Sequence, residues 1–431
     1  MKKQKIFFEI VPSCIIIFMP LLLITGPFLS DLGVSIVTIL FLINSKKNNL
    51  LKYYNNFYFK IFLVFWIILI ISSLLSNNIL GSLKNSLFYF RFGIFALCLW
   101  FLIDKNIKIL NYIFYSIIIC FSSLILDGYT QYFFGKNLFG VEMYRPDRVS
   151  SLFGSELILG SYLSRFFPIL FALFVFVDQK LQIKNKKLLS FLTLIFILSE
   201  GLIVLSGERV ALFFMNLSAI FIILMIKDYK KYRFWTYVCS LILILGLIFL
   251  FPSTKGRIIH QTINDFSGNA LPTDLNIVTD SEYKVNYIFS KSHNDKYITG
   301  ISIFLDNRFF GVGPRQFRHE CKKYPGAYSC DSHPHNTYVE LLSEAGFFAF
   351  FIVIGTFLLI VYLSLKQFFS QFFNSNKKYF SDFELCLLSA IIISLWPFSP
   401  NGAFFNNWLS IVYYFPIGIF LWSRNSNKKP N

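Results

Sequence analysis

Cys330-Asp-Ser-His-Pro-His-Asn-Thr-Tyr-Val-Glu340 is a polar stretch that runs directly into an apolar run at residues 339–364. Asn336 or Thr337 can cap the helix that begins here, because a side-chain oxygen there can accept from the free backbone N–H groups of the first turn. The stretch is the end of the longest hydrophilic segment, residues 253–338. This boundary predicts a chain of membrane helices interrupted by one large polar segment.

The composition of the 431-residue chain favours a membrane protein. The chain is 55% hydrophobic and only 15% charged, with a mean hydropathy of +0.59. Soluble domains of this length need more charge to cover their surface. The excess of 40 Lys and Arg over 23 Asp and Glu would suggest nucleic acid in a soluble protein. Most lysines here lie in short loops on one side of the predicted spans, so we predict no nucleic-acid partner.

Repeated apolar runs of about 18 to 20 residues predict transmembrane helices, because only a helix satisfies its own backbone in lipid. The expected fold is therefore all-α and polytopic, with about 12 spans and one large periplasmic loop before the tenth. We place the spans near residues 10–29, 30–44, 58–76, 86–103, 109–126, 157–177, 188–205, 210–226, 235–252, 339–364, 384–398 and 407–423.

Basic loops predict the orientation of these spans. Lysine-rich loops follow the second, sixth, eighth and tenth spans, and both termini are basic. Both termini are therefore expected in the cytoplasm, and residues 127–156 and 253–338 on the opposite face. The chain divides into residues 1–252 with nine spans, the polar segment 253–338, and residues 339–431 with three spans and a cytoplasmic tail.

Three ionisable residues, Arg91, Arg165 and Glu200, lie inside apolar runs. A charge in lipid is costly unless it is paired or faces water. Each is either a functional residue or half of a structural pair between helices, such as Glu200 with an arginine.

Two of the seven cysteines, Cys321 and Cys330, lie in the polar segment. In an oxidising compartment their short separation favours a disulfide. The alternative is a zinc site that adds His333 and His335, but the spacing matches no standard zinc pattern. We predict the disulfide and no metal.

Histidines and acids surround the start of the tenth span. His333 or His335 can take a proton from a hydroxyl at neutral pH, although one of the pair can instead have a structural role. Glu340 and Glu344 are four residues apart and would share one face of the helix.

Arginines from separate loops are expected on the same face. They include Arg148, Arg209, Arg257 and Arg315. Arginine makes bidentate contacts with phosphate, so several together could hold a diphosphate. The alternative for any one of them is an anchor for lipid headgroups.

The layout and five motifs resemble the O-antigen ligase family, which also includes O-antigen polymerases and protein O-oligosaccharyltransferases. The motifs are Arg148-Val-Ser-Ser-Leu-Phe-Gly154, Ser206-Gly-Glu-Arg209, Asn307-Arg-Phe-Phe-Gly-Val-Gly-Pro314, His333-Pro-His-Asn-Thr-Tyr338 and Glu344-Ala-Gly346. The most specific of them is the histidine motif together with the Glu-Ala-Gly motif.

The resemblance implies an inverting, metal-independent glycosyltransferase with a GT-C-like membrane architecture and no cofactor. Such enzymes act at the periplasmic face of the bacterial inner membrane. They move a finished glycan from undecaprenyl diphosphate to a hydroxyl acceptor, which in the ligases is a sugar of the lipid A core. A polymerase would instead lengthen the glycan on its carrier, and a protein ligase would modify Ser or Thr. A transporter is a rival of another class, but no internal repeat is visible.

The family's loop histidine maps onto His335 and its motif arginine onto Arg209, the two expected catalytic residues. Arg257 matches the second diphosphate-binding arginine by position, where Lys255 or Arg308 are alternatives. Arg148 and Arg315 are expected to add to the diphosphate site, and His333, Asn336 and Glu344 to support His335. Glu208 stands where the family usually has a small residue.

Overall fold

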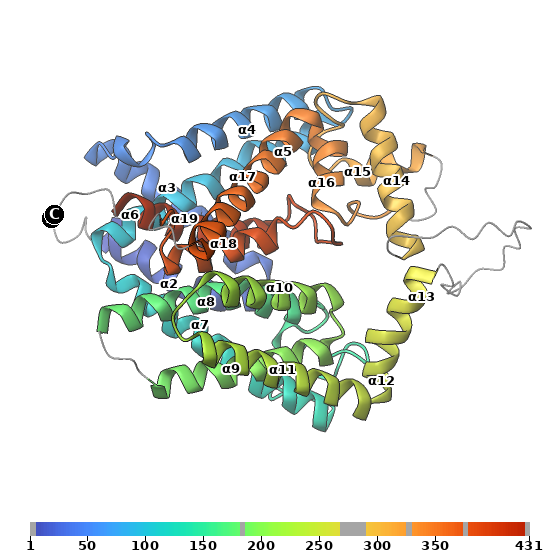
Figure 1. The fold of residues 1–431 in the computed structure, drawn as a ribbon. Helices are drawn as coiled ribbons and strands as arrows, with labels where there is room; N and C mark the ends of the chain where they lie inside the picture. Colours follow the sequence, from blue (N-terminus) through green and yellow to red (C-terminus); the bar gives the residue numbers. More distant parts are fainter. Residues whose placement is uncertain (1–5, 182–185, 268–289, 325–329, 374–377, 427–431) are drawn as a thin grey trace, which may run out of the picture.

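The structure is a computed structural model that describes residues 6–181, 186–267, 290–324, 330–373 and 378–426 (Figure 1). Within these ranges the chain is built from helices, and the predicted all-α class is confirmed. The helices, in chain order, are α2 (Val11–Ile24), α3 (Pro27–Asn48), α4 (Phe57–Leu74), α5 (Ile79–Phe88), α6 (Phe90–Lys105), α7 (Lys108–Phe134), α8 (Leu159–Leu181), α9 (Lys186–Ser206), α10 (Arg209–Met225), α11 (Lys230–Leu250), α12 (Pro252–Lys255), α13 (Gln261–Ser267), α14 (Lys291–Asp306), α15 (Phe317–Glu320), α16 (Thr337–Glu340), α17 (Gly346–Phe372), α18 (Asp382–Ser394) and α19 (Asn407–Ser426).

Nine helices in the described ranges are long and apolar enough to cross a membrane. They coincide with the predicted spans except the eighth, eleventh and twelfth, which correspond to α10, α18 and α19. Since α10 has 17 residues and α18 has 13, the count of twelve stays a prediction. The chain is a multi-pass membrane protein.

Helix ends follow local capping chemistry. The side chain of Asn56 accepts from the backbone N–H of Phe59 at the start of α4. Ser381 and Glu384 form a reciprocal capping box at the start of α18. Such caps satisfy backbone donors that a helix leaves without partners, so they determine where the short α18 begins.

The C-terminal helices hold the bundle together (Figure 1). α19 packs along α6, and α18 packs against α8. The contact between α6 and α19 is close, because a Cβ atom on Gly418 would lie 2.8 Å from the carbonyl oxygen of Ala96. Helices from the two ends of the chain and from its middle therefore share one buried core.

The described parts of residues 253–338 form short helices at one end of the bundle, seen on the right of Figure 1. A small apolar cluster of Ile303, Val312, Phe317 and Cys321 holds α14 and α15 together. In the described part of this segment, α14 packs against α16 and the start of the apolar helix. The side of the membrane on which they lie stays a prediction.

The Asn307–Pro314 and Glu344–Gly346 motifs interlock at this end. The backbone N–H of Gly313 donates to the carbonyl of Glu344 at 2.8 Å, and Phe347 N–H donates to the carbonyl of Arg308 at 2.8 Å. Gly311 and Gly346 both have positive φ, 65° and 77°. A Cβ atom on either would overlap the backbone of the opposite motif, so both positions require glycine.

Replacing Gly346 by alanine is expected to destabilise the protein by about 2 kcal/mol or more, because the new methyl group meets the backbone at Phe309 and the left-handed conformation disfavours it. A fall in the thermal unfolding midpoint of the purified protein measures this. Gly355→Ala in the same helix is the control, since no atom lies within 4 Å of its added Cβ. Equal midpoints for the two variants would contradict the interlock.

Candidate active site around His335

His335 lies in the turn that precedes α16. Its φ of 59° places it in the left-handed region, which histidine adopts more readily than branched residues do. The backbone on both sides is fixed. The His335 carbonyl accepts from Asn401 N–H at 2.7 Å. The Asn336 side chain accepts from Tyr338 N–H and Val339 N–H, so Asn336 is the predicted cap.

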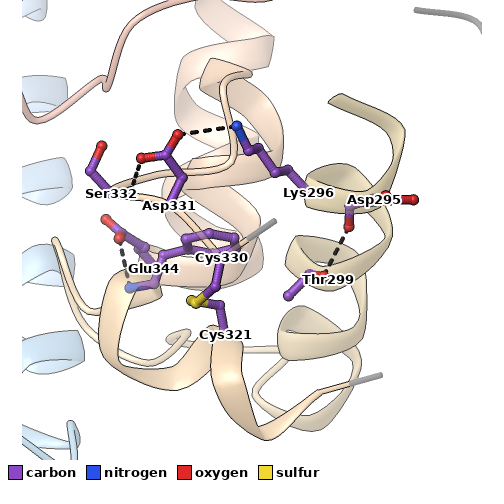
Figure 2. Close-up of a disulfide and its surroundings, with 9 residues drawn as sticks. Asp295, Lys296, Thr299, Cys321, Cys330, Asp331, Ser332 and Glu344 are labelled. Atoms are coloured by element: carbon purple, nitrogen blue, oxygen red, sulfur yellow. Dashed lines mark hydrogen bonds and ion pairs between the residues drawn. A yellow bond between two sulfur atoms is a disulfide. The ribbon is translucent and has the colours of Figure 1, made fainter. Parts of the chain in front are cut away.

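A carboxylate orients the His335 ring. Nε2 of His335 lies 2.9 Å from Oδ2 of Asp331, and the same oxygen accepts from Nζ of Lys296 at 3.1 Å, as Figure 2 shows. Hydrogen bonds from His335, Ser332 N–H and Lys296 hold the pKa of Asp331 below its usual value, although burial opposes them. An ionised carboxylate only accepts, so Nε2 donates and the lone pair lies on Nδ1.

Two further imidazoles contact His335. The His333 ring stacks on it with centroids 4.2 Å apart, and the His293 ring meets it edge-on at 5.6 Å. Burial and, next to it, the neighbouring His335 lower the pKa of His293 and of His333 to about 4. These two rings therefore stay neutral at pH 7 and place no positive charge beside His335.

The pKa of His335 is also lowered. Burial is the largest cause, Lys296 acts in the same direction, and the hydrogen bond and charge of Asp331 oppose both. An imidazole with a lowered pKa is neutral at pH 7 and protonates only as the pH falls through that lowered value. His335 is therefore in the form that can accept a proton.

A disulfide joins Cys321 to Cys330, with the two Cα atoms 5.6 Å apart (Figure 2). Cys330 immediately precedes Asp331, so this bond ties the residue that orients His335 to the small apolar cluster around Cys321. With both sulfur atoms in the disulfide, neither is a thiolate available to zinc.

Two arginines converge on the turn between α9 and α10. Nε of Arg257 donates to the carbonyl of Gly207 at 3.2 Å, and Nε of Arg148 donates to the carbonyl of Ser206 at 2.9 Å. Gly207 has a φ of 66°, and a Cβ atom there would lie 2.6 Å from Nε of Arg257. The glycine of the Ser206–Arg209 motif is thus needed both for the turn and for the arginine that covers it.

Arg209 begins α10 beside this turn. It forms an ion pair with Asp265 at 2.9 Å and donates to Oγ1 of Thr262 at 3.0 Å. Burial lowers the pKa of Arg148 and of Arg257, and the two arginines and Arg209 repel one another within this group. The three guanidinium groups therefore lie within electrostatic range of one another.

The contacts of Glu208 explain why a glutamate stands where the family usually has a small residue. Its two carboxylate oxygens accept from Gly160 N–H at 2.7 Å and Ser161 N–H at 2.9 Å. These are free donors of the first turn of α8, where a negative charge is stabilised. Burial raises the pKa of Glu208, while these hydrogen bonds and then Arg148 and Arg165 lower it. Glu208 therefore fixes the arginine turn to α8.

His293 connects the histidines with the arginines. Besides contacting the His335 ring, it lies within electrostatic range of Asp265 and Arg209. A second connection is buried: Arg165 donates to Oδ1 of Asn401 at 2.8 Å, and Nε2 of His333 lies 3.3 Å from the Asn401 carbonyl. His293 thus lies beside His335 and within electrostatic range of Arg209, which interacts in turn with Arg148 and Arg257.

The structure does not bring Arg315 to this region. Its guanidinium donates to the Phe405 carbonyl at 2.9 Å and lines a different cavity with Arg91. Glu344 is placed as a structural acceptor: its two oxygens accept from Arg315 N–H at 2.6 Å and Phe317 N–H at 2.9 Å. Glu340 accepts instead from Phe404 N–H at 2.9 Å, so the two glutamates bind different segments.

The three ionisable residues inside the apolar runs have three different kinds of partner. Arg91 pairs with Asp31 at 2.6 Å, and Arg165 bonds Asn401. Within the described residues Glu200 forms no ion pair with an arginine, so the suggested pairing is wrong: its carboxylate accepts from the side chain of Asn216 at 3.4 Å.

A model of the O-antigen ligase family matches residues 192–354. Over this region the chain is similar to the O-antigen ligase family. The match includes Arg209, Arg257 and His335, while Arg148 lies before it. No curated protein matches the chain. The family's members are membrane glycosyltransferase-like enzymes of the O-antigen ligase and polymerase type.

Sequence reasoning missed Asp331, His293, Lys296 and Asn401. Asp331 was detectable, because it lies four residues before His335 in the same polar stretch. His293, Lys296 and Asn401 belong to segments whose position relative to His335 depends on tertiary packing, and no local pattern marks them.

The charges around His335 predict that two substitutions shift its pKa in opposite directions. Asp331→Asn removes the carboxylate that raises the pKa of His335, so that pKa should fall further. Lys296→Gln removes a cation that lowers it, so the pKa should rise. Diethyl pyrocarbonate modifies only the neutral ring, and peptide mass spectrometry of the modified protein across pH gives the half-reactive point. Shifts of the same sign in both variants would contradict this arrangement.

Proposed function

We propose that the protein transfers a glycan from undecaprenyl diphosphate to the hydroxyl of a lipid A-core acceptor at the periplasmic face of the bacterial inner membrane. The observation that supports this proposal is the series of neighbours that leads from neutral His335 through His293 to Arg209, and from Arg209 to Arg148 and Arg257. A base and a diphosphate site are the two parts that this transfer requires.

The arginines would bind the diphosphate of the donor. Arg148 and Arg257 are already oriented by hydrogen bonds from Nε to the Ser206 and Gly207 carbonyls, and Arg257 also donates from Nη1 to Oε1 of Gln261 at 3.1 Å. The other guanidinium N–H groups would donate to phosphate. Arg209 would exchange its partner Asp265 for a phosphate oxygen. As the bond to the leaving group breaks, negative charge grows on the diphosphate, and prearranged cations stabilise it most at that point.

His335 would act as the general base. Nε2 is used by Asp331, so Nδ1 takes the proton of the acceptor hydroxyl. The hydroxyl oxygen then forms a bond to the anomeric carbon while the bond from that carbon to the phosphate oxygen breaks, which inverts the configuration. Undecaprenyl diphosphate leaves with the electron pair. The chain's own part is to hold the proton acceptor on one side of the anomeric carbon and the cations on the other.

His335→Asn is expected to reduce glycan transfer by about 100-fold or more, because asparagine tolerates the left-handed backbone but cannot act as a base at this pH. Transfer is measured with the purified protein, lipid-linked glycan and a lipid A-core acceptor. His319→Asn is the control, since His319 is exposed in the same polar segment. Undiminished transfer by His335→Asn would remove His335 from the catalytic role.

Arg209→Lys is expected to lower transfer by about 10-fold or more, because a point charge cannot reproduce the two parallel hydrogen bonds of a guanidinium. The same assay, with the donor concentration varied, separates weaker donor binding from slower chemistry. Arg318→Lys is the matched control, since Arg318 is an exposed arginine of the polar segment. Equal effects of both substitutions would reduce Arg209 to a general surface charge.

A further inference from the structure

A second cationic cavity lies away from the histidines. It has a volume of about 320 Å³ and is lined by residues of α3, α5, α6, the start of α19 and the segment around Arg315. This volume is within the range of small-ligand sites, about 300–1,000 Å³. It lies at the same end of the bundle as His335, because the neighbouring Asn77 donates to Glu320 and a Cβ atom on Gly313 would meet Ser76 and Ser82.

The charge of the cavity is positive. Lys84, Arg91 and Arg315 line it together with one acid, Asp31. Three cations and one carboxylate leave a formal excess of two positive charges. Arg91 uses Nε and one terminal nitrogen on Oδ1 of Asp31, so this acid compensates only one cation. Within the described ranges, neither Lys84 nor Arg315 forms an ion pair.

Arg315 is held in place by its backbone, and its guanidinium forms no ion pair within the described ranges, although Glu344 and Glu340 lie within electrostatic range of it. Its φ is 62°, and its N–H donates to Glu344 at 2.6 Å. Its side chain donates to the Phe405 carbonyl at 2.9 Å, which uses one of the five N–H donors of a guanidinium. Holding a non-glycine residue in this conformation costs free energy. In this conformation the guanidinium faces the cavity, and several of its N–H groups can donate to a ligand.

Exposed apolar residues flank the cavity on both sides. On α3, exposed Phe28 and Leu32 lie on the same helical face as the lining residues Asp31 and Ser35. On α5, Lys84 shares a face with Leu80, 76% exposed, and Leu87, 42% exposed. In a multi-pass membrane protein, exposed apolar helix faces contact lipid chains. The cationic cavity therefore opens between two lipid-facing surfaces, near the ends of the membrane helices.

We propose that this cavity binds the phosphate of an anionic membrane lipid, whose acyl chains lie along the exposed faces of α3 and α5. Arg315 and Arg91 supply planar N–H donors that match phosphate geometry, and Lys84 adds a point charge at the rim. The site is separate from the arginines at Gly207. A lipid held here would also support the segment that Glu344 clamps, because Arg315 belongs to both.

The experiment uses the full purified chain in detergent. Native mass spectrometry measures the binding of phosphatidylglycerol, with phosphatidylcholine of the same acyl chains as the zwitterionic comparison and inorganic phosphate as competitor. Wild-type protein should prefer phosphatidylglycerol. Lys84→Gln with Arg315→Gln should weaken its binding by about tenfold. Arg318→Gln is the matched control, because Arg318 is exposed, three residues from Arg315, and outside the cavity lining.

Several outcomes would overturn the proposal: equal binding of the two lipids, unchanged binding by the double variant, or complete displacement by millimolar inorganic phosphate, which would indicate a site for free anions. If the double variant does not fold, the binding of phosphatidylglycerol by the Lys84→Gln variant tests the proposal. Its position is exposed on α5, and binding should fall by about threefold. His335→Asn should keep full lipid binding, so this test is independent of the glycan-transfer proposal.

Discussion

The geometry of the site depends on one buried carboxylate. Glu344 accepts two backbone N–H groups from the segment that contains Arg315 and Phe317, and the glycines on either side allow the two backbones to touch. A buried carboxylate without such donors would be very unfavourable, so these hydrogen bonds hold the polar segment against the start of the apolar helix. That attachment brings α14, with His293 and Lys296, over the turn that holds His335.

The neutral histidines and the charged arginines form two separate groups of residues. Two partly buried imidazoles contact His335, and all three rings have a lowered pKa and remain uncharged at neutral pH. The arginines at the Gly207 turn keep their charge in spite of burial, because the ordinary pKa of a guanidinium is far above neutrality. A proton acceptor and a set of cations can therefore lie close together without the cations being lost or the base being protonated. Asp331 and Lys296 adjust this balance in opposite directions.

Local patterns predicted much of this arrangement from sequence. Apolar runs marked the helices, Asn336 marked the helix start, and the Ser206-Gly-Glu-Arg209 motif marked the turn at which Arg148 and Arg257 meet. Arg315 shows the limit: its residue type and loop resembled those of the other arginines, but its left-handed backbone directs the side chain into another cavity. Glu200 shows a second limit, because the partner of a buried charge is determined by helix packing and not by its neighbours in the chain.

The ion pair between Arg209 and Asp265 has a further consequence. A carboxylate attached to the same chain is present at a high effective concentration, so it competes with every dissolved anion for the guanidinium. Chloride or a single carboxylate from solution gains too little to displace it. A ligand with two adjoining phosphates can contact several guanidinium groups at once and offset the loss. Asp265 therefore favours the binding of multivalent anions at Arg209 over the binding of singly charged ones.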